Sequence, residues 1–280
     1  MDKKLLPATP SSYDKIIKLS FTLYRASFAK VIWLALLMSV ITFTPRLMVD
    51  LTGKNIFASF SLSNPYYWCF LLIDLLNVAL FVGIIWHMYC TARKRHEPLI
   101  EDITVGIKKT LYVFAASILQ AAILTAATIV IMGFQLLLAQ FNLLFNTSAL
   151  GMLFTGIVFT LELGVIIYLY TLFFFFIPLI AIENKGILVS LEKSIALVWN
   201  HWWRTFSVQL TPWVTYLLVL GFIRYVARIN VHIFFTQQLE YSIWTTLLQL
   251  VLFALLVPWI AALMVVQLKD LELRRELSAK

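Results

Sequence analysis

Charged residues are scarce in this sequence. Only 13% of its 280 residues are Asp, Glu, Lys or Arg, whereas 61% are hydrophobic. Soluble globular domains carry about 25% charged and about 45–50% apolar residues. The shortage of charge excludes a soluble domain of ordinary composition, and we expect residues 1–280 to form a single membrane domain in a lipid bilayer.

Cysteine and the usual catalytic groupings are also scarce. The two cysteines, Cys69 and Cys90, stand at opposite ends of one apolar run. A helix would hold them about 31 Å apart, too far for a disulfide. The loops carry no Ser/His/Asp grouping, no phosphate-binding glycine loop and no pair of clustered carboxylates. We therefore expect no enzymatic activity and no cofactor, and a membrane-embedded enzyme is the least favoured class.

The sequence also lacks a complete set of metal ligands. His87 and Cys90 stand three positions apart, and His96 follows six residues after Cys90. Zinc sites use such side chains, but no fourth ligand has a spacing that would complete the set. We predict no metal site and interpret these residues as ordinary polar groups near the membrane interface.

Six long, charge-poor runs are present. About twenty apolar residues suffice to cross a bilayer as a helix, and these runs are continuous and far longer than the alternating strands, roughly ten residues each, of a membrane barrel. The sequence therefore predicts an all-α integral membrane fold with six transmembrane helices, each of which satisfies its own backbone groups. The predicted spans cover about 31–49, 67–90, 110–139, 150–182, 205–226 and 242–267.

Lysine and arginine are distributed unevenly along the chain. Eighteen of the 22 lie before the first predicted span, in the second and fourth loops, or after the last span; the other four are Arg46, Lys54, Arg224 and Arg228. Positively charged loops stay in the cytoplasm, so we predict that both termini are cytoplasmic. The net charge of +8 then favours contact with anionic lipid headgroups. We expect no nucleic-acid partner, because no basic face interleaves with aromatic residues outside the membrane interface.

Residues 184–206 form an amphipathic segment between two spans. On a helix, apolar residues from Ile187 to Phe206 fall on one side and polar ones gather on the other. Tryptophan beside Lys and Arg is typical of a helix in the headgroup plane. The predicted lipid-interface residues are Lys193, Trp199, Trp202, Trp203 and Arg204, with Arg93, Lys94 and Arg95 in the second loop.

Similar amphipathic segments precede two other spans, from near residues 12 and 98. Leu99, Ile100, Ile103 and Ile107 keep the spacing of Ile187, Leu188, Leu191 and Ile195. We interpret this pattern as a threefold internal repeat of about 85 residues. Each unit would hold one interfacial helix and two spans, over about 12–92, 98–182 and 186–268, with a short cytoplasmic tail at 269–280.

Two acidic residues fall within predicted spans. Ionisable groups are costly inside a bilayer and are functional candidates for that reason. Asp74 and Glu162 are therefore candidates for proton or cation handling in a transporter; alternatively, Asp74 pairs with Arg46 or Arg224 as a structural tie within the bundle. The depth of Glu162 stays open, since it depends on which part of the run at 150–182 crosses the membrane.

The stretch "FIPLIAIENKGILVSLEKSIALVWNHWWRTF" at 176–206 resembles the YciC-type family of bacterial inner-membrane proteins. The similarity is carried by Pro178, by the turn from Glu183 to Gly186 and by the "SLEKSIALV" helix, and extends more weakly over all six spans. The resemblance implies a bacterial inner membrane and a role in envelope or lipid homeostasis, and it supplies no catalytic residues. We therefore predict a non-enzymatic protein whose partners are membrane lipids or membrane proteins, with a small-molecule or lipid transporter as the alternative.

Overall fold

The computed structural model describes residues 5–52, 65–95, 97–140, 148–229, 231 and 243–278. Over these ranges the chain is helical, with connecting turns and no strand. The elements are α1 (Tyr13–Thr52), α2 (Pro65–Ala92), α3 (Leu99–Gln140), α4 (Ala149–Leu172), α5 (Phe176–Glu183), α6 (Ile187–Val198), the 3₁₀ turn η1 (Trp199–His201), α7 (Trp202–Tyr225) and α8 (Ile243–Ser278).

The predicted all-helical fold is confirmed over the described ranges. Within the described ranges, six helical stretches are long and apolar enough to cross a bilayer. They cover Tyr13–Met48, Trp68–Ala92, Leu99–Gln140, Leu150–Glu183, Ile187–Tyr225 and Ile243–Ser278.

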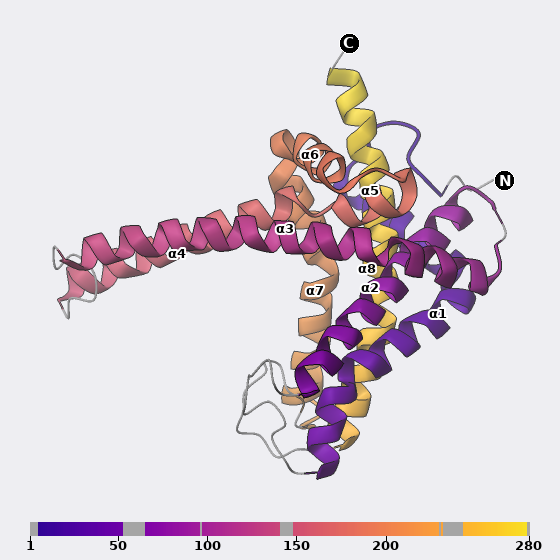
Figure 1. The fold of residues 1–280 in the computed structure, drawn as a ribbon, viewed down its shortest axis with the longest axis horizontal. Coiled ribbons are helices and arrows are strands. Elements are labelled where there is room, and N and C mark those ends of the chain that lie inside the picture. The colour runs from indigo at the N-terminus through magenta and orange to yellow at the C-terminus, as the bar shows by residue number, and fades with distance from the viewer. Residues whose placement is uncertain are drawn as a thin grey trace.

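The helices form an upright bundle and a lateral arm (Figure 1). α1, α2, α7 and α8 run side by side in the bundle, and α3 and α4 together form the arm, a long hairpin that projects sideways from it. The segment before α1 and the C-terminal part of α8 meet at one end of the bundle, close to α5 and α6 (Figure 1). We call this end the basic end, because Arg93, Lys193 and Arg204 lie there.

α8 is the central helix of the bundle. All nine residues from Ile260 to Leu268 are buried, so this part of α8 is covered on every side. A helix that is apolar and buried all round belongs in the interior of an assembly. The core therefore forms around α8, with α1, α2 and α7 packed against it.

The arm joins the bundle through a close crossing of α2 and α3. A Cβ atom on Gly106 would overlap the carbonyl oxygen of Ala79, and one on Gly83 would come within 3.0 Å of the carbonyl oxygen of Asp102. Small residues allow helix backbones to approach closely in membrane proteins. Glycine at these two positions is therefore what permits the arm to attach where it does.

Only the base of the arm is packed against the bundle. Every buried residue of α3 lies between Asp102 and Gln120. Further out, apolar side chains are open to the surroundings; Val130, for example, is 71% exposed. Exposed apolar surface of this extent needs an apolar environment, and lipid provides one.

Two predicted helix boundaries are absent from the structure. α1 and α3 each run without a break through the predicted starts of their spans near residues 31 and 110. No glycine or proline stands at either junction, so backbone hydrogen bonding continues. η1 separates α6 from α7, shortly before the start of the predicted fifth span near residue 205.

The predicted fourth span has a break that the sequence analysis missed. α4 ends at Leu172 and α5 begins at Phe176. Pro178 lies in the first turn of α5, where its missing N–H does no harm. Ser194 stabilises the break, because its hydroxyl donates to the carbonyl of Leu172 at 2.8 Å and accepts from the amide of Phe175 at 3.1 Å.

Candidate functional site

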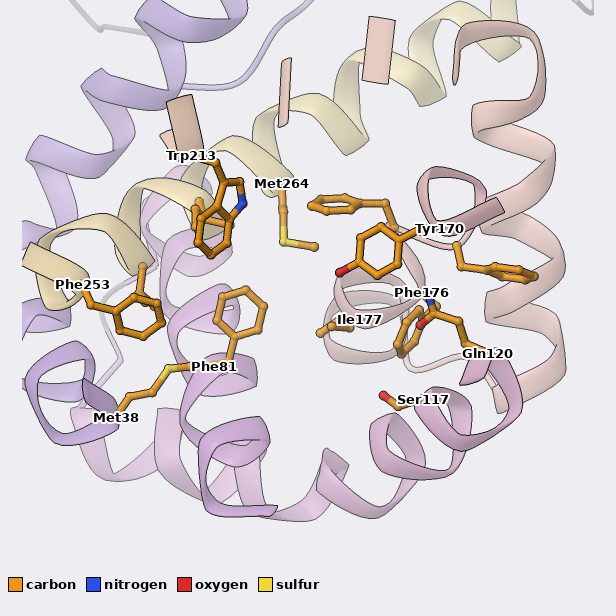
Figure 2. A pocket seen from close by; sticks show the side chains of 14 residues that line it. Met38, Phe81, Ser117, Gln120, Tyr170, Phe176, Ile177, Trp213, Phe253 and Met264 are labelled. Atoms are coloured by element: carbon orange, nitrogen blue, oxygen red, sulfur yellow. The ribbon is translucent and has the colours of Figure 1, made fainter. Parts of the chain in front are cut away.

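A cavity of about 600 Å³ lies where the arm meets the bundle. Every helix of the bundle and the arm contributes to its lining, as does α5. We call it the aromatic cavity, because seven of its fourteen lining residues are Phe, Tyr or Trp. The fourteen are Met38, Phe81, Ser117, Gln120, Tyr170, Phe173, Phe174, Phe176, Ile177, Trp213, Phe253, Val257, Ile260 and Met264 (Figure 2).

The break between α4 and α5 shapes one wall of the aromatic cavity. Phe173 and Phe174 lie in the turn, and Phe176 and Ile177 begin α5. Because Ser194 fixes both ends of this turn, these side chains are held at the cavity on a rigid piece of backbone.

Polar groups are few in the aromatic cavity, and no lining residue is charged. The hydroxyl of Ser117 donates to the carbonyl of Val113 in its own helix at 2.9 Å. The side chain of Tyr170 points into the cavity, and Gln120 lies near it on the adjacent helix (Figure 2). Within the described part of the chain, neither Gln120 nor the Tyr170 hydroxyl has a hydrogen-bond partner, so both can bond to a ligand.

Apolar pockets of about 300–1,000 Å³ with a few polar groups are typical of small-molecule sites. The aromatic cavity fits this description and reaches the surface, since Tyr170 is 54% exposed. Its lining suits an uncharged, chain-like or ring-like group, because a lining with so few polar side chains holds little water that a ligand would have to displace. The site has no signature in the sequence, because its residues come from seven helices and share no local pattern.

The two acidic candidates lie away from the aromatic cavity and from each other. Asp74 is exposed on α2. Glu162 lies within the arm, where a carboxylate oxygen accepts a hydrogen bond from the amide of Gln135. α4 begins at Ala149, which puts Glu162 about 20 Å into this helix.

The predicted arginine partners are not joined to Asp74. Arg46 is partly buried on α1, and Arg224 stacks its guanidinium 5.9 Å from the ring centre of Tyr225. Among the described residues, Asp74 has no ion pair or hydrogen bond with either arginine. The predicted tie to Arg46 or Arg224 is thus absent from the described part of the chain, and a role of Asp74 or Glu162 in transport stays a prediction.

Lys193 lies at the centre of an ion network at the basic end. Its ammonium bonds to Glu183 and, at 3.1 Å, to Glu272. Lys185 pairs with Glu183 at 3.0 Å, and Lys269 pairs with Glu272 at 3.2 Å. This network links the end of α5, α6 and α8, so Lys193 has an internal role besides its predicted contact with headgroups.

Arg204 belongs to a second cluster, which we call the Asp270 clamp. Asp270 is fully buried; one carboxylate oxygen accepts the backbone N–H of Ser11 at 2.6 Å, and the other accepts from Arg274 at 2.9 Å and faces Arg204 at 3.4 Å. Both guanidiniums also donate to the Ser11 carbonyl. The clamp fastens the segment before α1 to α7 and α8.

Asp270 was missed because the sequence around it suggests a solvated tail. Acidic and basic residues alternate after Leu268, yet Asp270 and Leu271 are buried and α8 continues to Ser278. The spacing of Asp270 and Arg274 on one helix face was the signal available in the sequence.

The predicted interface tryptophans differ in exposure. Trp199 and Trp203 are 56% and 64% exposed, whereas Trp202 packs edge-on against Tyr168 with ring centres 5.3 Å apart. Trp199 also contacts Tyr168, with ring centres 6.1 Å apart. Trp202 joins α7 to α4, and contact of the exposed Trp199 and Trp203 with headgroups stays a prediction.

The basic residues after α2 are all exposed at the surface. Arg93 stacks its guanidinium 5.4 Å from the ring centre of Tyr89. Lys94 has a left-handed backbone with φ of 58°, which is common where a helix ends. Arg95 follows it, and the contact of all three with lipid headgroups stays a prediction.

His87 and Cys90 have separate partners at the base of the arm. His87 bonds to Asp102 through Nδ1 and Oδ2 at 2.7 Å, and both side chains are buried. Cys90 and Trp86 both donate to one oxygen of Glu97, at 3.3 and 2.7 Å. No group of three or more possible metal ligands occurs among the described residues, and His96 lies outside them.

No protein-family model, curated protein or solved structure matches this chain.

Proposed function

We propose that this chain is a non-enzymatic, multi-pass protein of the bacterial inner membrane that binds the acyl chain of a lipid in the aromatic cavity. Its role would lie in envelope or lipid homeostasis. The proposal rests on the cavity itself, which has a volume of about 600 Å³. Half of its lining residues are aromatic and none is charged. An acyl chain is the apolar group that a bilayer supplies in greatest amount.

The arrangement of polar groups favours lipid binding over transport of an ion or polar solute. A transport path would bring ionisable residues to a shared site in the membrane. Asp74 and Glu162 instead lie apart, and neither lines the aromatic cavity. The few polar groups there, Gln120 and the Tyr170 hydroxyl, would bond to the ester region of a lipid or to a water beside it.

Orientation and the interfacial segments belong to the same proposal. The basic end would face the cytoplasm, because eighteen of the 22 Lys and Arg residues fall in the loops and termini assigned to that side. Exposed Trp199 and Trp203 support α6 and the start of α7 as headgroup-level anchors. The threefold repeat is supported by the amphipathic starts of α1, α3 and α6.

Photo-cross-linking with a lipid that carries a diazirine in its acyl chain tests the proposal. Ser117→Phe places a ring in the aromatic cavity; its matched control, Ile118→Phe, adds a ring to an exposed position of the same helix. The ring takes up volume that an acyl chain would need, so Ser117→Phe should lower labelling at the peptide 173–177 about tenfold, which corresponds to about 1.4 kcal/mol of binding free energy. Ile118→Phe should leave it unchanged.

The double variant Asp74→Asn/Glu162→Gln separates the alternatives. Under the proposal it keeps normal lipid labelling, because neither acid touches the cavity. Equal labelling of Ser117→Phe and the unaltered chain would show that lipid does not occupy the cavity.

A further inference from the structure

A second pocket, of about 220 Å³, lies at the basic end. It is formed where the segment before α1 meets the ends of α2, α5 and α8. We call it the basic-end pocket. Its charged lining residues are Arg93, Glu183, Lys269 and Glu272; Tyr89 also lines it, and its apolar lining includes Leu6 and Leu268.

Both carboxylates of the basic-end pocket are already bonded by lysines. Glu183 gives one oxygen to Lys193 and the other to Lys185. Glu272 likewise gives one oxygen to Lys193 and the other to Lys269. Each of the four carboxylate oxygens thus already faces a lysine ammonium, and these ion pairs offset the negative charge of both acids.

Two acids, Glu183 and Glu272, and two cations, Arg93 and Lys269, line this pocket. Lys185 and Lys193 pair with the acids from outside the lining, so the cluster as a whole has two more cations than acids. The guanidinium of Arg93 is oriented by the ring of Tyr89 and has no carboxylate partner among the described residues. Its planar set of N–H donors suits bidentate binding of a phosphate or carboxylate.

We propose that the basic-end pocket binds a phosphate ester, with Arg93 and Lys269 donating hydrogen bonds to the phosphate oxygens. A guanidinium and an ammonium in the lining of one pocket match a group with several acceptor oxygens and a charge of −1 or −2. The apolar lining residues Leu6 and Leu268 suit the carbon skeleton attached to the phosphate. Ligand binding there would also hold Leu6 against α8, and so fix the segment before α1.

The site stands independently of the aromatic cavity, because the two pockets share no lining residue. Phosphate esters reach this position from two sources: a soluble phosphate compound or the headgroup of an anionic phospholipid. The same chemistry would recognise both.

The first arm of the test measures binding of inorganic phosphate and of glycerol phosphate to the full chain in neutral detergent by titration calorimetry, at constant ionic strength set with chloride. Arg93→Gln removes the guanidinium at an exposed position, so the fold should be unaffected. The matched control is Arg95→Gln, two residues away, exposed and outside the pocket. We expect Arg93→Gln to weaken binding about tenfold and Arg95→Gln to leave it unchanged.

The second arm reconstitutes the chain in nanodiscs that contain phosphatidylglycerol and phosphatidylcholine in equal amounts, and counts retained lipid by native mass spectrometry. Retention of phosphatidylglycerol that depends on Arg93 and not on Arg95 identifies a lipid headgroup; binding only in the first arm identifies a soluble ester. The absence of both, or equal loss in Arg93→Gln and Arg95→Gln, overturns the proposal. Ser117→Phe should bind phosphate, glycerol phosphate and phosphatidylglycerol like the unaltered chain in both experiments. A failure of the proposal for the aromatic cavity can therefore be told apart from a failure of this one.

Discussion

Single side chains at the basic end decide how the termini are held. The carboxylate of Asp270 is fully buried and is the shared partner of two arginines and of the Ser11 backbone. A buried cluster of charges is stable only while every charge has its partner. Removing one member leaves the remaining charges buried without a counter-charge.

Asp270→Asn should therefore destabilise the chain substantially. It keeps the side-chain volume but leaves the guanidiniums of Arg204 and Arg274 without their anionic partner. Loss of one member of a buried pair costs about 3–5 kcal/mol; because the arginine side chains are 24% and 25% exposed, we expect the lower end of that range. Thermal unfolding in detergent measures the change, with Glu276→Gln, exposed on the same helix, as control. An unchanged unfolding temperature for Asp270→Asn would show that the clamp is dispensable.

At the scale of elements, the crossing of α2 and α3 sets the position of the arm. Gly106→Ala introduces a methyl group where the carbonyl of Ala79 already lies, and helix backbones cannot yield without moving the arm. Gly133→Ala is the matched control, since a Cβ there meets nothing within 4 Å and alanine is the better helix former by about 1 kcal/mol.

We expect Gly106→Ala to lower thermal stability and to open the pair His87–Asp102 next to it, whereas Gly133→Ala should be neutral or stabilising. Hydrogen exchange over 99–110, followed by mass spectrometry, measures the loosening of α3. Identical protection in the two variants would show that the crossing tolerates a side chain.

Elements also show what the sequence can and cannot predict. Six long apolar runs dictate six spanning helices, because burial of backbone in lipid allows little else. The continuity of α1 and α3 was not predicted. The side-chain pattern changes from amphipathic to apolar near residues 31 and 110, but such a change does not require a break in the helix. The break at 173–175 and the aromatic cavity depend on Ser194, which is distant in sequence, and no local pattern encodes such a tertiary contact.

At the scale of the whole molecule, the proposed orientation predicts which residues a membrane-impermeant thiol reagent reaches. Cys69 is exposed near the start of α2, at the opposite end of this helix from Lys94. With the basic end in the cytoplasm, the reagent should label Cys69 of the unaltered chain in intact cells. It should not label the double variant Cys69→Ser/Lys94→Cys until the cells are permeabilised, because position 94 would then lie on the cytoplasmic side. The reverse pattern would invert the topology.

The central place of α8 has a consequence for biosynthesis. α8 packs against α1, and its Asp270 accepts a hydrogen bond from Ser11 in the segment before α1, 259 residues away in the chain. At a synthesis rate of about 5–20 residues per second, α1 waits roughly 10–50 s in the membrane before α8 emerges. During that interval α1, α2 and α7 lack the helix around which they pack, and their inner faces must be shielded by lipid or by the insertion machinery. Assembly of this protein is therefore delayed until after its helices have been inserted, and a ribosome that stalls before α8 leaves a membrane intermediate without a core.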